Sequence, residues 1–349
     1  MLDLNRTAET GDLAVGAGAR PRLAVGALLR GWWVTSRMEY LPDALVHVAL
    51  PLLLVLRQHT LSVQLTKLSL AGLAVWLLGH WVGSSLNCLA DYDVDRLDAG
   101  HKARLAEAID RAGVRPILVI NLAEIAAATL ASFWLAYRFG KPLLVFFWLA
   151  GLAVAYLYSF EPFRLKRRNF LNPLALAVIV YATPLFFVYH LIAPAWDAFD
   201  VTLLVVYCFQ MVPMFLADEL SDHDEDKAGG VNNPCVVYGR VAACRLAIAV
   251  YALSCAASLL LFAAQPVTRN LTGVFFFLLS VVIYLWVIRE FVRLDRVSRA
   301  IEAAGSAAER EGLTRELKAF SRTPAWLVAT SVGVILLVAP LVYLSRASL

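Results

Sequence analysis

Long apolar blocks recur along almost the whole chain, and they constrain the fold more than any other feature of the sequence. Each block is about 20 residues long, the length that an α-helix needs to cross about 30 Å of hydrocarbon. The blocks lie at residues 40–57, 69–90, 116–137, 142–160, 172–192, 200–218, 242–264, 271–290 and 324–345. Hydrophobic residues make up 60% of the chain and charged residues 17%, whereas soluble domains average about 45–50% and 25%. The sequence therefore predicts an all-α, polytopic membrane bundle of about nine transmembrane helices.

Lysine and arginine are concentrated in alternate loops, which predicts the orientation of the helices. The loops after the second, fourth, sixth and eighth blocks are rich in basic residues, and the other loops contain few. Because basic loops remain on the cytoplasmic side, we expect these loops and the N-terminus to be cytoplasmic, in a bacterial-type cell membrane. Residues 1–38 show no signal-peptide pattern and are interpreted as a cytoplasmic leader. Residues 39–349 then form one membrane domain.

Two acidic clusters follow the second and sixth blocks, and both lie on the predicted cytoplasmic side. In each cluster, three oxygen-bearing side chains are spaced four residues apart, so they share one helical stripe about 12 Å long. These residues are Asn87, Asp91 and Asp95 in "NCLADYDVD", and Asp218, Asp222 and Asp226 in "DELSDHDED". Two matched stripes of oxygen ligands suit a hard cation such as Mg²⁺, which favours carboxylates together with substrate phosphates. We therefore expect all six residues to be metal ligands.

Polar and basic side chains near these clusters indicate a site for a diphosphate group. The candidates for binding it are Asn87, Lys102, Arg104, Tyr158, Arg164, Lys166 and Lys227. Cationic side chains pair strongly with phosphate oxygens, and a metal ion bridging phosphate to carboxylate would take the remaining charge. Arg167 and Arg168 are interpreted instead as anchors that hold their loop on the cytoplasmic side.

Together these motifs resemble the UbiA superfamily of intramembrane prenyltransferases. That family has a first motif, NDxxDxxxD, and a second motif, DxxxDxxxD, at the cytoplasmic ends of helices two and six of a nine-helix bundle. "YSFEPFRLKRR" resembles its YSxPPxRLKRR-type stretch, and "DEDKAGGVNNPCVVYGRVAA" resembles the continuation after its second motif. The resemblance covers about residues 30–290. It implies a central cavity capped by the cytoplasmic acidic motifs, with Asp91, Asp95, Asp218 and Asp222 in catalytic roles and Mg²⁺ as cofactor.

The chain also departs from the family pattern at several positions. Cys88 stands where the family usually has a second acidic residue, and Glu225 replaces the usual glycine before Asp226. The segment "HKARLAEA" lacks the RPLPSG-like sequence that is common after the first motif. These differences indicate a divergent branch. Because position 88 lies about 100° around the helix from Asn87, we expect Cys88→Asp to be tolerated.

The resemblance implies Mg²⁺-dependent transfer of a prenyl group from a polyprenyl diphosphate to a lipophilic acceptor, an aromatic one in the leading interpretation. This is a reaction of isoprenoid biosynthesis carried out within the bilayer, and no nucleic-acid partner is expected. An alternative is a membrane terpene synthase of the same superfamily, which uses no acceptor. A transporter with acidic gates is disfavoured, because the acidic residues cluster at one face only. Residues 291–323 are expected to form an amphipathic cytoplasmic helix without a catalytic role.

Overall fold

The computed structural model describes residues 25–38, 45–96, 101–265, 270–321 and 325–347, and helices dominate these ranges. Among the described residues, seven helices are long and apolar enough to cross a membrane. Two shorter apolar helices, α3 (Val46–Leu56) and α7 (Leu143–Ser159), correspond to the first and fourth blocks. No β-strand occurs in the described ranges. The predicted all-α, polytopic membrane fold is therefore confirmed.

Six long helices correspond to single apolar blocks: α4 (Val63–Asp95), α6 (Val114–Phe139), α10 (Ala198–Ala228), α12 (Arg240–Ala263), α13 (Leu271–Ala303) and α15 (Ala325–Ala347). The fifth block is divided into α8 (Leu171–Leu176), a π-helical turn η3 (Ala177–Ala182) and α9 (Thr183–Ile192). The remaining elements are α1 (Val25–Thr35), α5 (His101–Ala112), the 3₁₀ turn η2 (Leu165–Arg167), α11 (Pro234–Tyr238) and α14 (Ala307–Ser321). π-helical turns are rare and occur frequently at functional sites, and η3 borders the cavity described below.

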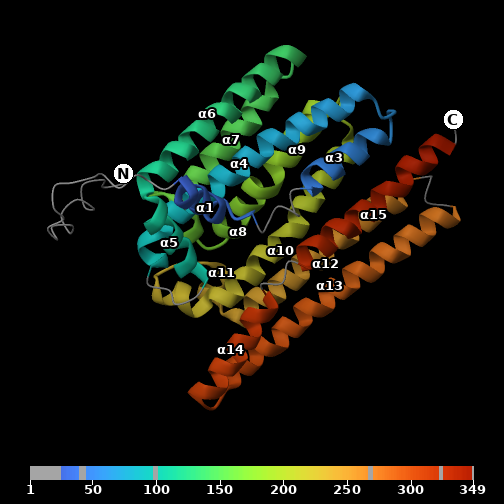
Figure 1. Cartoon of the computed structure of the whole chain (residues 1–349). Helices are drawn as coiled ribbons and strands as arrows, with labels where there is room; N and C mark the ends of the chain where they lie inside the picture. The colour runs from blue at the N-terminus through green and yellow to red at the C-terminus, as the bar shows by residue number, and fades with distance from the viewer. Residues whose placement is uncertain (1–24, 39–44, 97–100, 266–269, 322–324, 348–349) are drawn as a thin grey trace, which may run out of the picture.

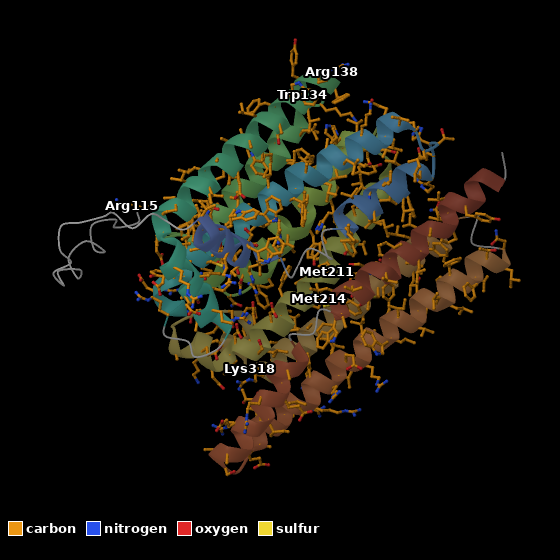
Figure 2. The ribbon with its side chains drawn as sticks, viewed as in Figure 1. Arg115, Trp134, Arg138, Met211, Met214 and Lys318 are labelled. Carbon is orange, nitrogen blue, oxygen red and sulfur yellow. The ribbon has the colours of Figure 1, made fainter. Side chains whose placement is uncertain are left out.

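The bundle has two distinct ends, and both acidic clusters lie at the same one. The short helices α5, α11 and α14 gather at this end (Figure 1). Arg115 and Arg138, near the start and the end of α6, mark the two opposite ends of the bundle (Figure 2). Because α4 leads into α5, and α10 leads into α11, their acidic C-terminal turns meet at the same end. We call it the acidic end.

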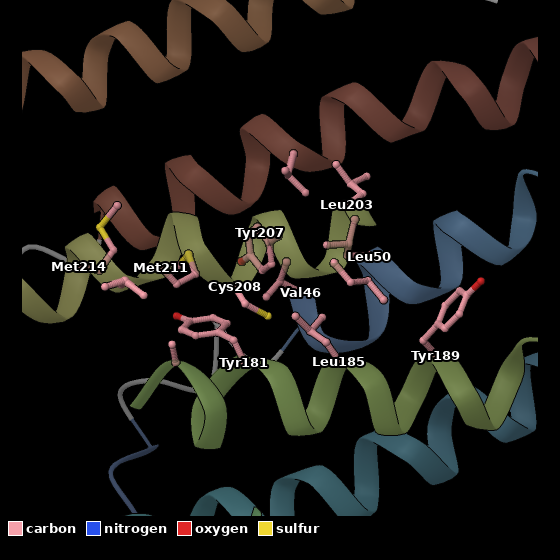
Figure 3. Close-up of a cluster of buried hydrophobic side chains, with 14 of the residues drawn as sticks. Val46, Leu50, Tyr181, Leu185, Tyr189, Leu203, Tyr207, Cys208, Met211 and Met214 are labelled. Atoms are coloured by element: carbon pink, nitrogen blue, oxygen red, sulfur yellow. The ribbon is translucent and has the colours of Figure 1, made fainter. Parts of the chain in front are cut away.

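The core is built around α10, which contacts α12, α15 and the η3 turn. Figure 3 shows Tyr181, Tyr207 and Met211 within this packed cluster, between α9, α10 and α15. Polar side chains inside the bundle bond across helices: Tyr207 Oη lies 2.7 Å from Ser331 Oγ. Gln210 Nε2 donates to Ser258 Oγ at 2.8 Å. Such interhelical bonds satisfy polar groups that the bilayer cannot solvate, and they hold α10 in a fixed position.

Ion pairs and caps fasten the end of the bundle opposite the acidic clusters. Arg57 Nη2 contacts Asp197 Oδ1 at 2.8 Å and Asp200 Oδ1 at 3.0 Å, joining the C-terminus of α3 to the start of α10. Lys141 Nζ donates to the carbonyl oxygens of His190, Leu191 and Ala193 at the C-terminus of α9. The turn from α6 into α7 uses Gly140 at φ 64°, a conformation that glycine adopts without steric cost. Polar contacts therefore join α3, α6, α9 and α10 at this end of the bundle.

A helix, α1, lies within the residues that the sequence assigns to the leader. It packs against α5, α4 and α6. The contact with α5 is close, because a Cβ added to Gly31 would lie 2.4 Å from Ala112 Cβ. The Trp32 indole Nε1 donates to Glu124 Oε1 on α6 at 2.8 Å. The boundary at residue 38 stays a prediction, and residues 1–24 lie outside the described part of the chain.

Candidate active site

The first acidic stripe occupies the last turns of α4, where the helix reaches the acidic end. Asn87 lines the main cavity and accepts a long hydrogen bond, 3.5 Å, from Ser159 Oγ on α7. Asp91 is 21% exposed and pairs with two cations, Arg164 and Lys166. Asp95 is buried, with 8% of its surface exposed. A single helix thus carries these three side chains from the cavity wall to its C-terminal turn at the acidic end.

The second stripe has the same arrangement at the end of α10. Asp218 lines the main cavity, as Asn87 does. Asp222 Oδ1 accepts a hydrogen bond from Ser221 Oγ at 3.0 Å. Asp226 Oδ2 accepts one from Asn233 Nδ2 at 2.7 Å, at the start of α11. The stripe therefore runs from the cavity to the loop that follows the helix.

Tyr158, near the end of α7, lies close enough to both stripes to interact with them electrostatically. Its hydroxyl lies within electrostatic range of Asp91 on the first motif and of Asp218 and Asp226 on the second. Glu219, which lies next to Asp218, is also within this range. Carboxylates from two helices more than 100 residues apart in sequence thus act electrostatically on one phenol. The structure brings both acidic motifs and Tyr158 into one region.

The cations between the motifs come from the loop after α7. Arg164 adopts a left-handed backbone conformation, with φ 37°, and its Nη2 lies 3.0 Å from Asp91 Oδ1. Lys166, on η2, contacts the same oxygen and is 12% exposed. Burial lowers the pKa of Lys166, while Asp91 acts in the opposite direction and favours its charged form. Two cations on one carboxylate oxygen leave donor capacity that phosphate oxygens could use.

The other predicted diphosphate-binding residues lie elsewhere or cannot be placed. Arg104 on α5 lines a separate groove against α1, together with Arg30 and Arg111. Lys227 is exposed at the end of α10. The side chain of Lys102 lies outside the described part of the chain. Of the predicted cations, the described contacts therefore connect Arg164 and Lys166 to the acidic motifs, and roles for Lys102, Arg104 and Lys227 stay predictions.

An apolar cavity of about 310 Å³ lies beside the acidic end, between α4, α7 and the fifth block. Its walls carry the aromatic side chains Trp76, His80, Phe147, Trp148, Tyr181, Phe187 and Phe215. Several of these rings are stacked: Trp76 lies 5.2 Å from His80 between ring centroids, and His47 lies between Trp76 and Tyr181. The polar part of the wall includes Asn87, Tyr158, Ser159, Asp218 and Arg37. The cavity thus joins an aromatic chamber to one residue from each acidic motif.

Two polar residues of this region were not expected from the sequence. Arg37 lines the cavity, but it falls within the residues assigned to the leader, where a single arginine gives no signal. Glu219 is 5% exposed and accepts a hydrogen bond from Asn172 Nδ2 at 2.8 Å. It therefore connects the second motif to the start of α8. The sequence around Glu219 could not predict the contact with Asn172, because the two residues are 47 positions apart in the chain.

The structure places Cys88 on a buried face of α4, which bears on the expected tolerance of Cys88→Asp. The side chain is only 2% exposed and belongs to a small apolar cluster with Leu105, Ile109 and Ala112 of α5. An aspartate at this position would bury a carboxylate among apolar side chains, at a cost of several kcal/mol. This burial argues against the expectation that Cys88→Asp is tolerated, because α5 covers this face of α4.

The donor set fits a hard divalent cation that is shared with a phosphate ligand. Among the described residues, no group of three or more His, Cys, Asp or Glu side chains is positioned to form a complete metal site. Mg²⁺, however, usually takes only one or two protein carboxylates and completes its shell with water and phosphate oxygens. Two stripes of carboxylate and amide oxygens at the same end of the bundle are donors of this kind. The residues present therefore fit an ion that binds together with its substrate.

Comparison with known proteins identifies the family of this fold and site. The model of the UbiA prenyltransferase family matches residues 45–306, well over half of the chain. The chain therefore belongs to the UbiA prenyltransferase family. No curated protein sequence matches it significantly.

Solved structures show the same fold at low sequence identity. A UbiA homologue from Archaeoglobus fulgidus bound to DMAPP and Mg²⁺ aligns with a TM-score of 0.55 at 17% identity, covering 87% of this chain and 99% of that one. The same homologue bound to GPP and Mg²⁺ gives a TM-score of 0.56. A digeranylgeranylglyceryl phosphate synthase aligns at 0.55 with 13% identity, covering 88% of this chain and 98% of that one. At these identities the likeness concerns the fold alone.

Proposed function

We propose that this protein transfers a prenyl group from a polyprenyl diphosphate to a lipophilic, aromatic acceptor within the membrane, in a Mg²⁺-dependent reaction. One observation carries this proposal. The aromatic cavity has Asn87 and Asp218 in its wall, one from each acidic motif, beside the cations that contact Asp91. An apolar chain and a diphosphate group need these two environments next to each other. The archaeal homologue of the same fold, bound to DMAPP or GPP with Mg²⁺, supports the assignment.

The acidic end would hold the diphosphate. Mg²⁺, when bound by the stripes Asn87–Asp91–Asp95 and Asp218–Asp222–Asp226, would stabilise the negative charge of the departing diphosphate. Arg164 and Lys166 would donate hydrogen bonds to the phosphate oxygens with N–H groups that do not contact Asp91. Tyr158, between the motifs, would donate its hydroxyl proton in a hydrogen bond to the same group. These interactions strengthen as the leaving group gains charge, so they favour ionisation of the allylic carbon–oxygen bond.

The cavity would hold the prenyl chain and the allylic cation that ionisation leaves. Its aromatic walls, which include Trp76, Trp148 and Tyr181, would exclude water and stabilise a cation through their π-systems. An acceptor ring that enters the cavity would then attack the first carbon of the chain. The acceptor proton leaves to base or solvent, and diphosphate leaves on the acidic side. Arg37, in the cavity wall, is a further candidate for contact with either substrate.

The chain is an integral, multi-pass membrane protein, and we propose that its acidic end faces the cytoplasm. The basic loops that follow α4, α7, α10 and α13 lie at this end, which agrees with the positive-inside rule. Water-soluble diphosphate would then be released to the cytoplasm, while the apolar substrate and product stay in the bilayer.

The test is incubation of the purified protein with labelled geranyl, farnesyl and longer prenyl diphosphates and Mg²⁺, with and without a panel of phenolic acceptors. Prenylated product that forms only when an acceptor is present would support the proposal. Hydrocarbon or alcohol products that form equally well without an acceptor would support a membrane terpene synthase instead. No consumption of any diphosphate would contradict both functions.

A further inference from the structure

The last turns of α10 are held from more than one side by residues of other helices. Asp224, on the face of α10 away from the ligand stripe, pairs with Arg240 of α12 at 2.8 Å. Arg240 is only 6% exposed. Glu225 lies three residues after Asp222, at the edge of the stripe, and its Oε1 is 2.5 Å from Lys318 Nζ of α14. Contacts on two faces restrict how far this helix end can rotate about its own axis.

The helix that carries Lys318 is itself firmly packed. Leu317, the preceding residue, is fully buried, and Leu313 packs against the main core. α14 contacts both α10 and α13. Figure 2 shows Lys318 close to the end of α10. The lysine is therefore presented to Glu225 by a helix whose position is fixed by buried apolar side chains.

This arrangement lies partly outside the part of the chain that matches the family. The family match ends at residue 306, and α14 begins at Ala307. Glu225 occupies a position where the family usually has glycine. Lys318 thus lies beyond the residues that the family model matches.

We infer that Lys318 is a positioning residue for the metal stripe of α10: its ion pair with Glu225 holds Asp222 and Asp226 at the rotation that Mg²⁺ and diphosphate require. The inference rests on the proposed function. It assigns a role to the helical segment after α13, for which the sequence alone predicts no catalytic role. The pair is partly exposed, with 30% of Lys318 and 41% of Glu225 accessible, so its effect should be moderate.

The experiment compares Lys318→Glu with Arg315→Glu, a matched control on the same helix. Arg315 Nε lies 3.9 Å from Glu311 within α14, and both side chains are more than 70% exposed. Both substitutions change the charge equally, but only the first removes the contact with α10. The readout is the rise in unfolding temperature of the detergent-solubilised protein as Mg²⁺ is titrated in the presence of inorganic pyrophosphate. The Mg²⁺ dependence of turnover is measured in parallel.

We expect Lys318→Glu to raise the Mg²⁺ concentration needed for half of the effect by about two- to fivefold, the size that partly exposed ion pairs produce. Arg315→Glu should leave it unchanged. The conservative variant Lys318→Arg, which keeps the cation, should stay close to the wild-type value. The direction of the change in the Mg²⁺ concentration distinguishes two explanations. Loss of the ion pair should raise the concentration needed, whereas an added negative charge that acts only through its electric field would attract Mg²⁺ and lower it.

Two outcomes would overturn the inference. In one, Lys318→Glu behaves like Arg315→Glu or binds Mg²⁺ more tightly than the wild type. In the other, Lys318→Arg is as impaired as Lys318→Glu. Failure of the proposed function gives a different result: the wild-type protein itself would show no stabilisation by Mg²⁺ and pyrophosphate.

Discussion

Arg164 and Asp91 are 73 residues apart in the chain, yet the guanidinium Nη2 of one lies 3.0 Å from the carboxylate Oδ1 of the other. The ion pair joins the loop after α7 to the first acidic motif. Both side chains are largely shielded, with 14% and 21% exposed. The structure therefore places this loop cation directly beside the first acidic motif.

Neutralising the two loop cations should impair use of the prenyl diphosphate. For Arg164→Gln and Lys166→Gln, we expect kcat/KM to fall about 10- to 100-fold, because each charge-assisted contact contributes about 1.5–3 kcal/mol. The control is Arg167→Gln in the same loop, for which the described residues show no ion pair. Steady-state kinetics at fixed Mg²⁺ on membrane-inserted protein would measure the difference. Equal losses in all three variants would mean that the loop acts only as a topological anchor.

Gly83 offers a way to fill the cavity without disturbing the helices. It lines the cavity, and a Cβ added there meets no atom within 4 Å. Gly83→Ala should keep activity, since alanine is favoured over glycine within a helix by about 1 kcal/mol. Gly83→Phe should reduce turnover, most strongly for the longer prenyl diphosphates.

Gly312→Phe is the control for this substitution, because Gly312 on α14 is equally open and lies away from the cavity. Activity would be compared across diphosphates of increasing chain length, and thermal unfolding would confirm that each variant is folded. A folded Gly83→Phe protein with an unchanged chain-length preference would argue that the prenyl chain binds elsewhere.

Cys88→Asp should destabilise the protein. The carboxylate would replace a side chain that is 98% shielded among apolar neighbours on α4 and α5, and uncompensated burial of a charge costs several kcal/mol. Cys88→Ala removes only one buried sulfur atom and should be much better tolerated. Thermal unfolding of the two variants in the same detergent tests this. An aspartate variant as stable as the wild type would contradict this prediction and support the expectation from the sequence that Cys88→Asp is tolerated.

The fold and the acidic motifs could be predicted because they depend on local patterns. The length of each apolar block reports a membrane-spanning helix, since the bilayer thickness fixes the number of residues required. The spacing of Asp91 and Asp95, and of Asp218 and Asp222, reports a helical stripe directly. Basic loops alternate along the chain, and each acidic stripe lies beside one of them. This pattern predicts that both stripes lie at the same end of the bundle, as they do in the structure.

Other features depend on contacts between distant segments, which no local pattern contains. Arg37 enters the cavity wall because α1 folds back against α4 and α5. The same packing buries Cys88. Arg104, a plausible phosphate ligand by its position in the sequence, lies instead in the groove against α1. Glu219 meets Asn172 only because α8 lies beside α10. In each case the burial or partner of the residue is decided by the packing of a second helix.

The most direct test of the central claim is Mg²⁺-dependent release of diphosphate from a labelled prenyl diphosphate by the wild-type protein and three alanine variants. Asp91→Ala and Asp222→Ala remove one ligand from each stripe, and Asp93→Ala removes an exposed acid from the same turn of α4, off the stripe. We predict that the wild type and Asp93→Ala release diphosphate, and that a chelator abolishes this activity and Mg²⁺ restores it. In the two stripe variants, the rate of diphosphate release should fall about 10²-fold or more. Near-normal release by folded Asp91→Ala or Asp222→Ala protein at saturating Mg²⁺ would contradict it.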